Sequence, residues 1–138
     1  MDLREMMEQY AIEQIVSQGQ RACLEQLEAI IAEYDRKREQ GEIPRQEDYL
    51  FHKTLYEGAN NRLLLKLFQS IEDLENLWSV QVIDAVDAPV FGRDTEPLHR
   101  QILEAMKIGD VKSAKRFMRK HFEILRADLD RLDEKLFK

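Results

Sequence analysis

The chain has 138 residues, a formal net charge of −6, 43% hydrophobic residues and 35% charged residues. This length and composition predict a single domain over residues 1–138 that buries its own core, and they exclude a disordered chain. The single cysteine excludes a disulfide scaffold. No apolar run is long enough to cross a membrane and no secretion signal is visible, so we expect a soluble, cytoplasmic protein. The acidic balance argues against nucleic-acid binding by this chain alone, because neutralising phosphates needs a basic face.

Helical periodicity of apolar residues runs through almost the whole chain. It predicts six amphipathic helices, over residues 3–16, 20–40, 44–57, 62–86, 96–108 and 111–136. In the first helix the apolar stripe passes through Leu3, Met7, Ala11 and Ile15. Gly41 is expected to end the second helix in a left-handed cap.

The predicted connections are short, apart from a loop over residues 87–94 that contains Pro89 and Gly92. Thr95 is the predicted N-cap of the helix that follows this loop. Trp78, on the apolar stripe of the fourth helix, is predicted to be a core residue. With no competing strand pattern, these elements favour an all-α fold, an antiparallel bundle of about six helices.

All three histidines, His52, His99 and His121, lie within or beside an apolar stripe. A buried imidazole is costly unless its nitrogens find partners. Asp48 precedes His52 by four residues, so both side chains share one helix face and offer two ligands to a transition metal. His99 and His121, from two other helices, could complete a site of one Asp and three His. Equally, Asp48 and His52 could form a surface ion pair, and the histidines could be hydrogen-bonded core residues.

Two separated motifs carry a resemblance to a known family. The segment DYLFH at 48–52, followed by Asn61, resembles the D-x-x-F-H…L…N signature of the FCD domain. The segment HRQILEAMKIGD at 99–110, followed by His121, resembles the pattern H-x-x-I-x-x-A-x-x-x-G-D…A…M…H of the same family. The FCD domain is the C-terminal effector-binding domain of GntR-type bacterial transcription regulators in the FadR subfamily.

The resemblance implies a six-helix bundle of the VanR-like branch and a divalent transition metal that binds a small carboxylate effector. Zinc is the first expectation, with nickel or another transition metal as alternatives. The implied metal ligands are Asp48, His52, His99 and His121. Arg4 matches a first-helix arginine that contacts the effector in some members, and Asn61 matches a family asparagine near the pocket. Arg4 could equally be a solvated helix-start residue, and Asn61 a helix-boundary residue.

The chain departs from the family pattern in three places. The family places a winged helix-turn-helix before this domain, whereas this chain begins at a Met directly before the effector-domain helix. We therefore expect an excised domain or a stand-alone relative, and DNA as a partner only through that missing N-terminal domain. Asn60 stands where glycine is usual, and Leu98 stands where an acidic residue is usual.

The sequence thus predicts a non-enzymatic, homodimeric ligand sensor. A carboxylate effector would bias the helix positions and, in an intact regulator, the spacing of two DNA-reading heads. Two alternatives remain at this point. One is a metal-free helical dimerisation module, in which the histidines are core residues. The other is a small metal-dependent hydrolase, although no motif places a general base beside the ligands.

Overall fold

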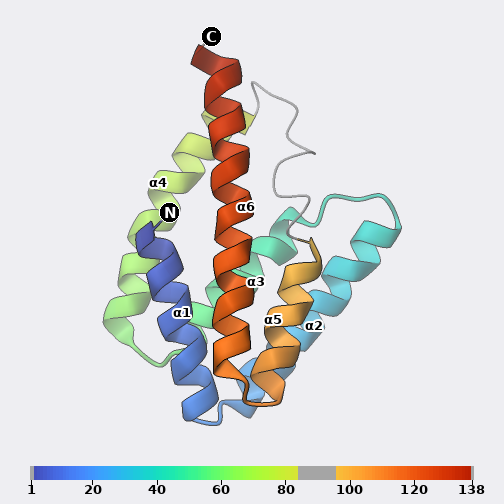
Figure 1. Cartoon of the computed structure of the whole chain (residues 1–138), viewed down its shortest axis with the longest axis vertical. Helices are drawn as coiled ribbons and strands as arrows, with labels where there is room; N and C mark the ends of the chain where they lie inside the picture. The colour runs from blue at the N-terminus through green and yellow to red at the C-terminus, as the bar shows by residue number, and fades with distance from the viewer. Residues whose placement is uncertain (1, 84–95, 138) are drawn as a thin grey trace.

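A computed structural model of the chain describes the backbone of residues 2–83 and 96–137, and the side chains of residues 2–73 and 97–131. Its helices are α1 (Asp2–Ser17), α2 (Arg21–Glu39), α3 (Arg45–Gly58), α4 (Arg62–Ile83), α5 (Glu96–Lys107) and α6 (Val111–Phe137) (Figure 1). The predicted all-α class is confirmed, and every helix begins within one residue of its predicted start. The predicted loop, its Thr95 cap, the fourth helix beyond Ile83 and the Trp78 side chain lie outside the described residues.

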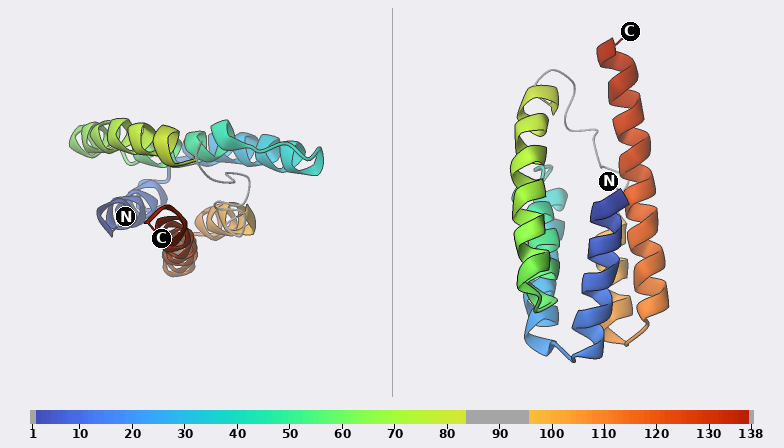
Figure 2. Two further views of the ribbon diagram at one scale, coloured as in Figure 1. Left: turned by 90° about the horizontal axis from the view of Figure 1, so that it is seen from above. Right: turned by 90° about the vertical axis from the view of Figure 1, so that its left-hand side faces the viewer.

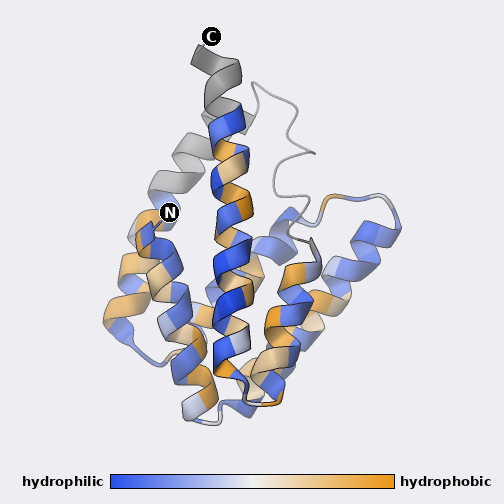
Figure 3. Cartoon of the chain, in the orientation of Figure 1, coloured by the Kyte–Doolittle hydropathy of each residue, from blue (hydrophilic) through white to orange (hydrophobic). Residues whose placement is uncertain are grey.

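The helices form two layers (Figure 2). One layer holds α4, α3 and α2 side by side, and the other holds α1, α6 and α5. The layers contact each other where α1 packs on α3 and where α2 packs on α5. Hydrophilic and apolar stretches alternate along each helix, as expected for helices that bury one face (Figure 3). None of the described helices is both long and apolar enough to cross a bilayer.

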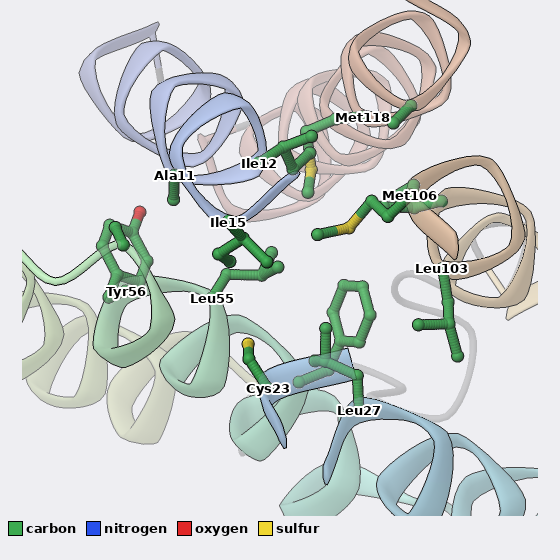
Figure 4. Packing of buried hydrophobic residues seen from close by; sticks show 14 of the residues in the cluster. Ala11, Ile12, Ile15, Cys23, Leu27, Leu55, Tyr56, Leu103, Met106 and Met118 are labelled. Carbon is green, nitrogen blue, oxygen red and sulfur yellow. The ribbon is translucent and has the colours of Figure 1, made fainter. Parts of the chain in front are cut away.

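The apolar core fills the space between the two layers, where its side chains point toward one another (Figure 4). Cys23 and Leu27 reach it from α2, and Leu55 reaches it from α3. The opposite layer contributes Met106 from α5 and Met118 from α6. Burial and the nearby Glu57 raise the pKa of the Cys23 thiol to about 11, so this cysteine is an unreactive core residue.

The buried face of α1 contains Met7, Ala11 and Ile15 of the predicted stripe but not Leu3. It runs through Glu8, Ala11, Ile12 and Ile15, all fully buried, whereas Leu3 is 53% exposed. The prediction for Leu3 was wrong because residues spaced by four drift around a helix by about 40° per step. Over three steps from Ile15 the drift is about 120°, which carries Leu3 out of the core. Glu8 lies seven residues before Ile15, only about 20° from it around the helix, and is therefore buried.

Two turns explain how α2 and α3 end. Gly41 has a φ of 78°, which confirms the left-handed cap predicted after α2. Asn60, just after α3, has a φ of 56°. Asparagine adopts this conformation more readily than other non-glycine residues, which explains how it can replace the glycine that is usual there.

Gly58 marks the closest approach between α3 and the first two helices. A Cβ atom at this position would collide with the Sγ atom of Cys23 and would lie 3.1 Å from side-chain atoms of Ile15. The absence of a side chain therefore lets α3 pack tightly on α1 and α2. This packing fixes the position of α3, which also carries Asp48 and His52.

Candidate metal centre

Four side chains predicted as metal ligands converge between the two layers. Each offers one ligand atom, and these atoms all lie within 4.8 Å of one another. Asp48 and His52 come from α3, His99 from α5 and His121 from α6. The imidazole ring centroids are 4.9 to 5.7 Å apart. The fold thus assembles the complete predicted set, although metal binding by it remains a prediction.

Asp48 lies at the open side of this cluster. Its Oδ1 atom is 2.8 Å from His99 Nε2 and 3.7 Å from His52 Nε2, so one carboxylate oxygen faces two imidazoles. The Asp48 side chain is 48% exposed, whereas His52, His99 and His121 are at most 2% exposed. A small ligand would therefore approach the buried imidazoles from the side of Asp48.

The cluster also concentrates unsatisfied polar atoms. Among the described residues, buried side-chain atoms without a hydrogen-bond partner are His52 Nε2, His99 Nδ1, His121 Nδ1 and Glu47 Oε2. Three of these are imidazole nitrogens of the cluster. Unpartnered buried polar atoms are rare in folded proteins because each has lost its hydration without compensation. A transition metal is a natural partner for imidazole nitrogens beside a carboxylate, so the residues present fit such an ion.

Aromatic side chains wall the cluster. The ring of Phe51 packs edge-on against His52 and His99, at centroid distances of 5.3 and 4.9 Å. On the α6 side, the rings of His121 and Phe122 are 5.2 Å apart. These two apolar rings keep water away from the faces of the imidazoles that they cover, and charges interact more strongly in such surroundings.

Glu8, which the sequence analysis did not single out, completes the site from α1. Its side chain is fully buried, and its Oε1 atom accepts a hydrogen bond from His52 Nδ1. Its Oε2 atom accepts from Arg4 Nε at 2.9 Å and from the Tyr56 hydroxyl at 3.0 Å. Because Nδ1 of His52 is engaged by Glu8, its Nε2 atom is the one that faces Asp48.

Charge is distributed unevenly among the histidines. Burial alone lowers the pKa of an imidazole, but the negative charges of Glu8 and Asp48 outweigh it and raise the pKa of His52 to about 9. Burial alone raises the pKa of a carboxyl group, but the positive charges of His52 and Arg4 lower the pKa of Glu8 to about 2. Without a metal ion, Glu8 and His52 therefore form a buried ion pair at neutral pH, and an ion that binds Nε2 of His52 would displace the proton from that nitrogen.

The pKa values of His121 and Asp48 are both lowered, which leaves the imidazole neutral and the carboxylate ionised. Burial, together with repulsion from His52 and His99, holds the pKa of His121 well below its usual value. Partial desolvation by the surrounding protein opposes ionisation of Asp48, but its contacts with His52 and His99 prevail and keep its pKa well below the usual range. Neutral imidazole and ionised carboxylate are the forms that bind metal ions.

Arg4 and Asn61, the predicted effector-binding residues, lie in different surroundings. The Arg4 side chain is 15% exposed, and besides its contact with Glu8 its guanidinium carbon is 5.4 Å from the ring centroid of Phe122. Asn61 caps α4, because its Oδ1 atom accepts a hydrogen bond from the backbone N–H of Leu64 at 3.1 Å. Arg4 is thus linked to the histidine cluster through Glu8, whereas Asn61 stabilises the start of α4. Effector binding by either residue remains a prediction.

Two features together define the class of this protein: an all-α bundle of two layers and a buried cluster of three histidines with one carboxylate. The family model for the FCD domain matches residues 1–124, and the chain belongs to this family. The FCD domain is the effector-binding domain of GntR-type transcription regulators. No curated protein and no solved structure matches the chain.

Proposed function

We propose that this chain is a ligand-sensing domain of a GntR/FadR-type regulator that binds a divalent transition metal and a small carboxylate. The residues that would hold the metal are Asp48, His52, His99 and His121. The observation that carries the proposal is the convergence of their ligand atoms within 4.8 Å. The unpartnered imidazole nitrogens beside Asp48 support it as well. Zinc is the first expectation for the ion, and nickel the second.

The protein's own residues would shape ligand binding in three ways. A bound transition metal would supply a Lewis-acidic position that attracts carboxylate oxygens. The half-exposed Asp48 would leave one side of the cluster open to solvent, while Phe51 and Phe122 would keep water away from the imidazoles that they cover. Arg4 would then provide a second anchor for the effector carboxylate.

Regulation would follow from the position of these residues on different helices. Asp48 and His52 belong to one layer, whereas His99 and His121 belong to the other. A ligand that contacts both layers favours one packing of the helices over another, by as much as its affinities for the two differ. In an intact regulator this preference would change DNA binding by the winged helix-turn-helix domain.

The test is elemental analysis of the purified, untagged protein, with and without added zinc or nickel. We expect about one ion per chain, and its loss in the His52→Ala/His121→Ala double variant. The matched control is Asp35→Ala, which removes an exposed carboxylate outside the cluster and should keep the ion. Cys23→Ser should keep it as well, because this thiol lies in the apolar core.

The same experiment separates the two alternatives. No metal in the wild-type protein, and no uptake on addition, would leave a metal-free helical dimerisation module with core histidines. Turnover of a carboxylate ester by the metal-loaded protein, abolished by Asp48→Ala, would instead indicate a hydrolase. With metal bound and no turnover, small carboxylates should raise the thermal stability of the loaded protein.

A homodimer is part of the proposed function, and the exposed apolar side chains support a specific surface for it. In the described part of the chain, five of the seven large hydrophobic residues that are exposed lie on α1 and α4. They are Leu3, Met6, Tyr10, Leu63 and Leu67. The two helices approach each other here, since the amide of Asn61 lies 3.4 Å from the Tyr10 hydroxyl. Apolar surfaces of this kind mark contacts between proteins.

The oligomeric state measured by analytical ultracentrifugation tests this surface. We expect a dimer for the wild-type protein and a monomer for the Met6→Glu/Leu63→Glu variant. The control is Ile108→Glu, which changes a side chain that is 80% exposed at the end of α5. A dimer that survives the double substitution would place the interface elsewhere.

A further inference from the structure

Glu8 is the most deeply buried charged residue near the candidate metal centre. Its side chain has no solvent exposure, yet it lies on α1, which contributes none of the four predicted ligands. A buried carboxylate is tolerated only when its oxygens are compensated by hydrogen bonds or opposite charge. Both oxygens of Glu8 are compensated: His52 contacts one, and Arg4 and Tyr56 contact the other.

We propose that Glu8 is a positioning residue that orients His52 for metal binding and couples the metal centre to Arg4 on the first helix. The proposal rests on the proposed function above. The geometry that supports it is the hydrogen bond between Glu8 Oε1 and His52 Nδ1, which leaves His52 Nε2 directed toward Asp48. Carboxylates that bond the outer nitrogen of a ligating histidine fix its tautomer and ring orientation, and removing them weakens metal affinity about 10- to 100-fold.

The coupling to Arg4 follows from the second oxygen of Glu8. Oε2 accepts hydrogen bonds from both Arg4 Nε and the Tyr56 hydroxyl, so a shift of Arg4 changes the contacts of the carboxylate that holds His52. An effector carboxylate that pairs with Arg4 would compete with Glu8 for it. Coupling between two sites is reciprocal, so the ion and the effector would each change the affinity for the other.

Tyr56 ties this network to α3. Its hydroxyl points toward α1 in Figure 4, and it stands four residues after His52 on the same helix. Burial and the negative charge of Glu8 raise the pKa of Tyr56, so the phenol keeps its proton and remains a hydrogen-bond donor. Glu8 therefore contacts two consecutive turns of α3, and its orientation relative to His52 is fixed by three partners.

Zinc affinity, measured by competition with a chromophoric chelator, tests the positioning role. We expect Glu8→Gln to weaken zinc binding about 10- to 100-fold. The matched control is Glu5→Gln, which removes a charge from the same helix at a residue paired with Arg126 and should leave the affinity unchanged. The absorption spectrum of the Co²⁺-loaded protein should shift in Glu8→Gln and not in Glu5→Gln, because only the former changes the ligand environment.

A double-mutant cycle tests the coupling. Arg4→Gln should weaken zinc binding in the wild-type background, and this effect should shrink in the Glu8→Gln background, because Arg4 acts through Glu8. Equal effects of Arg4→Gln in both backgrounds would contradict the coupling. Wild-type affinity and an unshifted Co²⁺ spectrum in Glu8→Gln would contradict the positioning role.

The outcomes distinguish this inference from the proposed function. Absence of zinc binding by the wild-type protein would overturn both. Zinc binding by the wild-type protein with no loss in Glu8→Gln would overturn only the role of Glu8. If Glu8→Gln does not fold, as judged by circular dichroism, Tyr56→Phe replaces it. This variant removes one hydrogen bond to Oε2, and it should lower zinc affinity in the same direction by a smaller factor; unchanged affinity would overturn the proposal.

Discussion

The two halves of α3 are buried in different ways. Its first half, taken here as far as His52, presents Asp48 and His52 to a cluster that contains unpartnered imidazole nitrogens. Its second half presents Leu55 and Gly58 to apolar neighbours with tight packing, and none of the buried side-chain polar atoms in this described segment lacks a partner. The second half is stabilised by apolar packing and by hydrogen bonds that are already made, whereas the stability of the first half depends on what binds there. Structure and ligand sensing thus share one helix but depend on different interactions.

The largest expected effect is in the apolar half. Leu55 is fully buried, so Leu55→Ala removes apolar contacts and leaves a cavity. We expect a loss of about 2–5 kcal/mol in the free energy of unfolding. Urea denaturation of the metal-free protein would measure it as a lower midpoint with an unchanged slope. If the comparison is correct, the folded variant keeps wild-type zinc stoichiometry, and a loss of zinc would show that the halves are not separable.

The next effect is in the polar half. A ligand that binds only the folded state stabilises it by about 2.7 kcal/mol when present at 100 times its dissociation constant. We expect zinc to give a gain of this order in the wild-type protein and in Leu55→Ala. The Asp48→Ala/His99→Ala variant, in which two ligands are absent, should show none. Thermal melts at matched zinc and protein concentrations would measure the gain.

Acidification should reduce the gain in thermal stability that zinc gives. Protons compete with the ion for the imidazole nitrogens of His52, His99 and His121, so zinc stabilisation should be smaller at pH 5 than at pH 8. Stability of Leu55→Ala relative to wild type, measured without zinc, should depend far less on pH because no titratable group is removed. A zinc-induced gain that is constant between pH 5 and 8 would contradict histidine ligation.

The two halves of α3 also differ in how far the sequence predicted them. Helical periodicity was enough to predict the helices and most of the core residues, because it indicates which face of each helix is buried. It was also enough to put Asp48 and His52 on one face of α3. It could not show that His99 and His121 meet them, because that depends on how three helices pack. The resemblance to the FCD family supplied this step.

The sequence did not predict the burial of Glu8 at the site, and the reason is physical. It forms a pair with Arg4 at a spacing of four, which is also the usual pattern of an exposed ion pair on a helix. The available signal was its register, because Glu8 shares the face of Ala11, Ile12 and Ile15. A charged residue on an apolar face indicates a buried partner, but the sequence does not show which of its 21 basic residues or three histidines that partner is.

The third effect concerns the tight packing at Gly58. Gly58→Ala introduces a Cβ atom that collides with Cys23 Sγ, and overpacking of this kind costs about 1–3 kcal/mol. Cys23→Ala removes the obstructing sulfur, so the double variant should be more stable than the sum of the single changes indicates. If the losses in stability of the two single variants add up in the double variant, the collision is contradicted. Zinc affinity should remain unchanged in the folded variants, because neither residue contacts the cluster.

The smallest expected effect tests whether Asn61 belongs to the structural half or to the sensing half. Asn61→Ala removes the acceptor that caps α4 and should cost about 1 kcal/mol with or without ligand. Asn61→Asp keeps the capping oxygen but lacks the amide that contacts the Tyr10 hydroxyl, so it should keep most of the stability. If Asn61 only caps α4, carboxylates should stabilise metal-loaded Asn61→Asp as much as the wild-type protein. If Asn61→Asp retains its stability but loses the response to carboxylates, the amide binds the effector, and the sensing site extends beyond the histidine cluster to the end of α3.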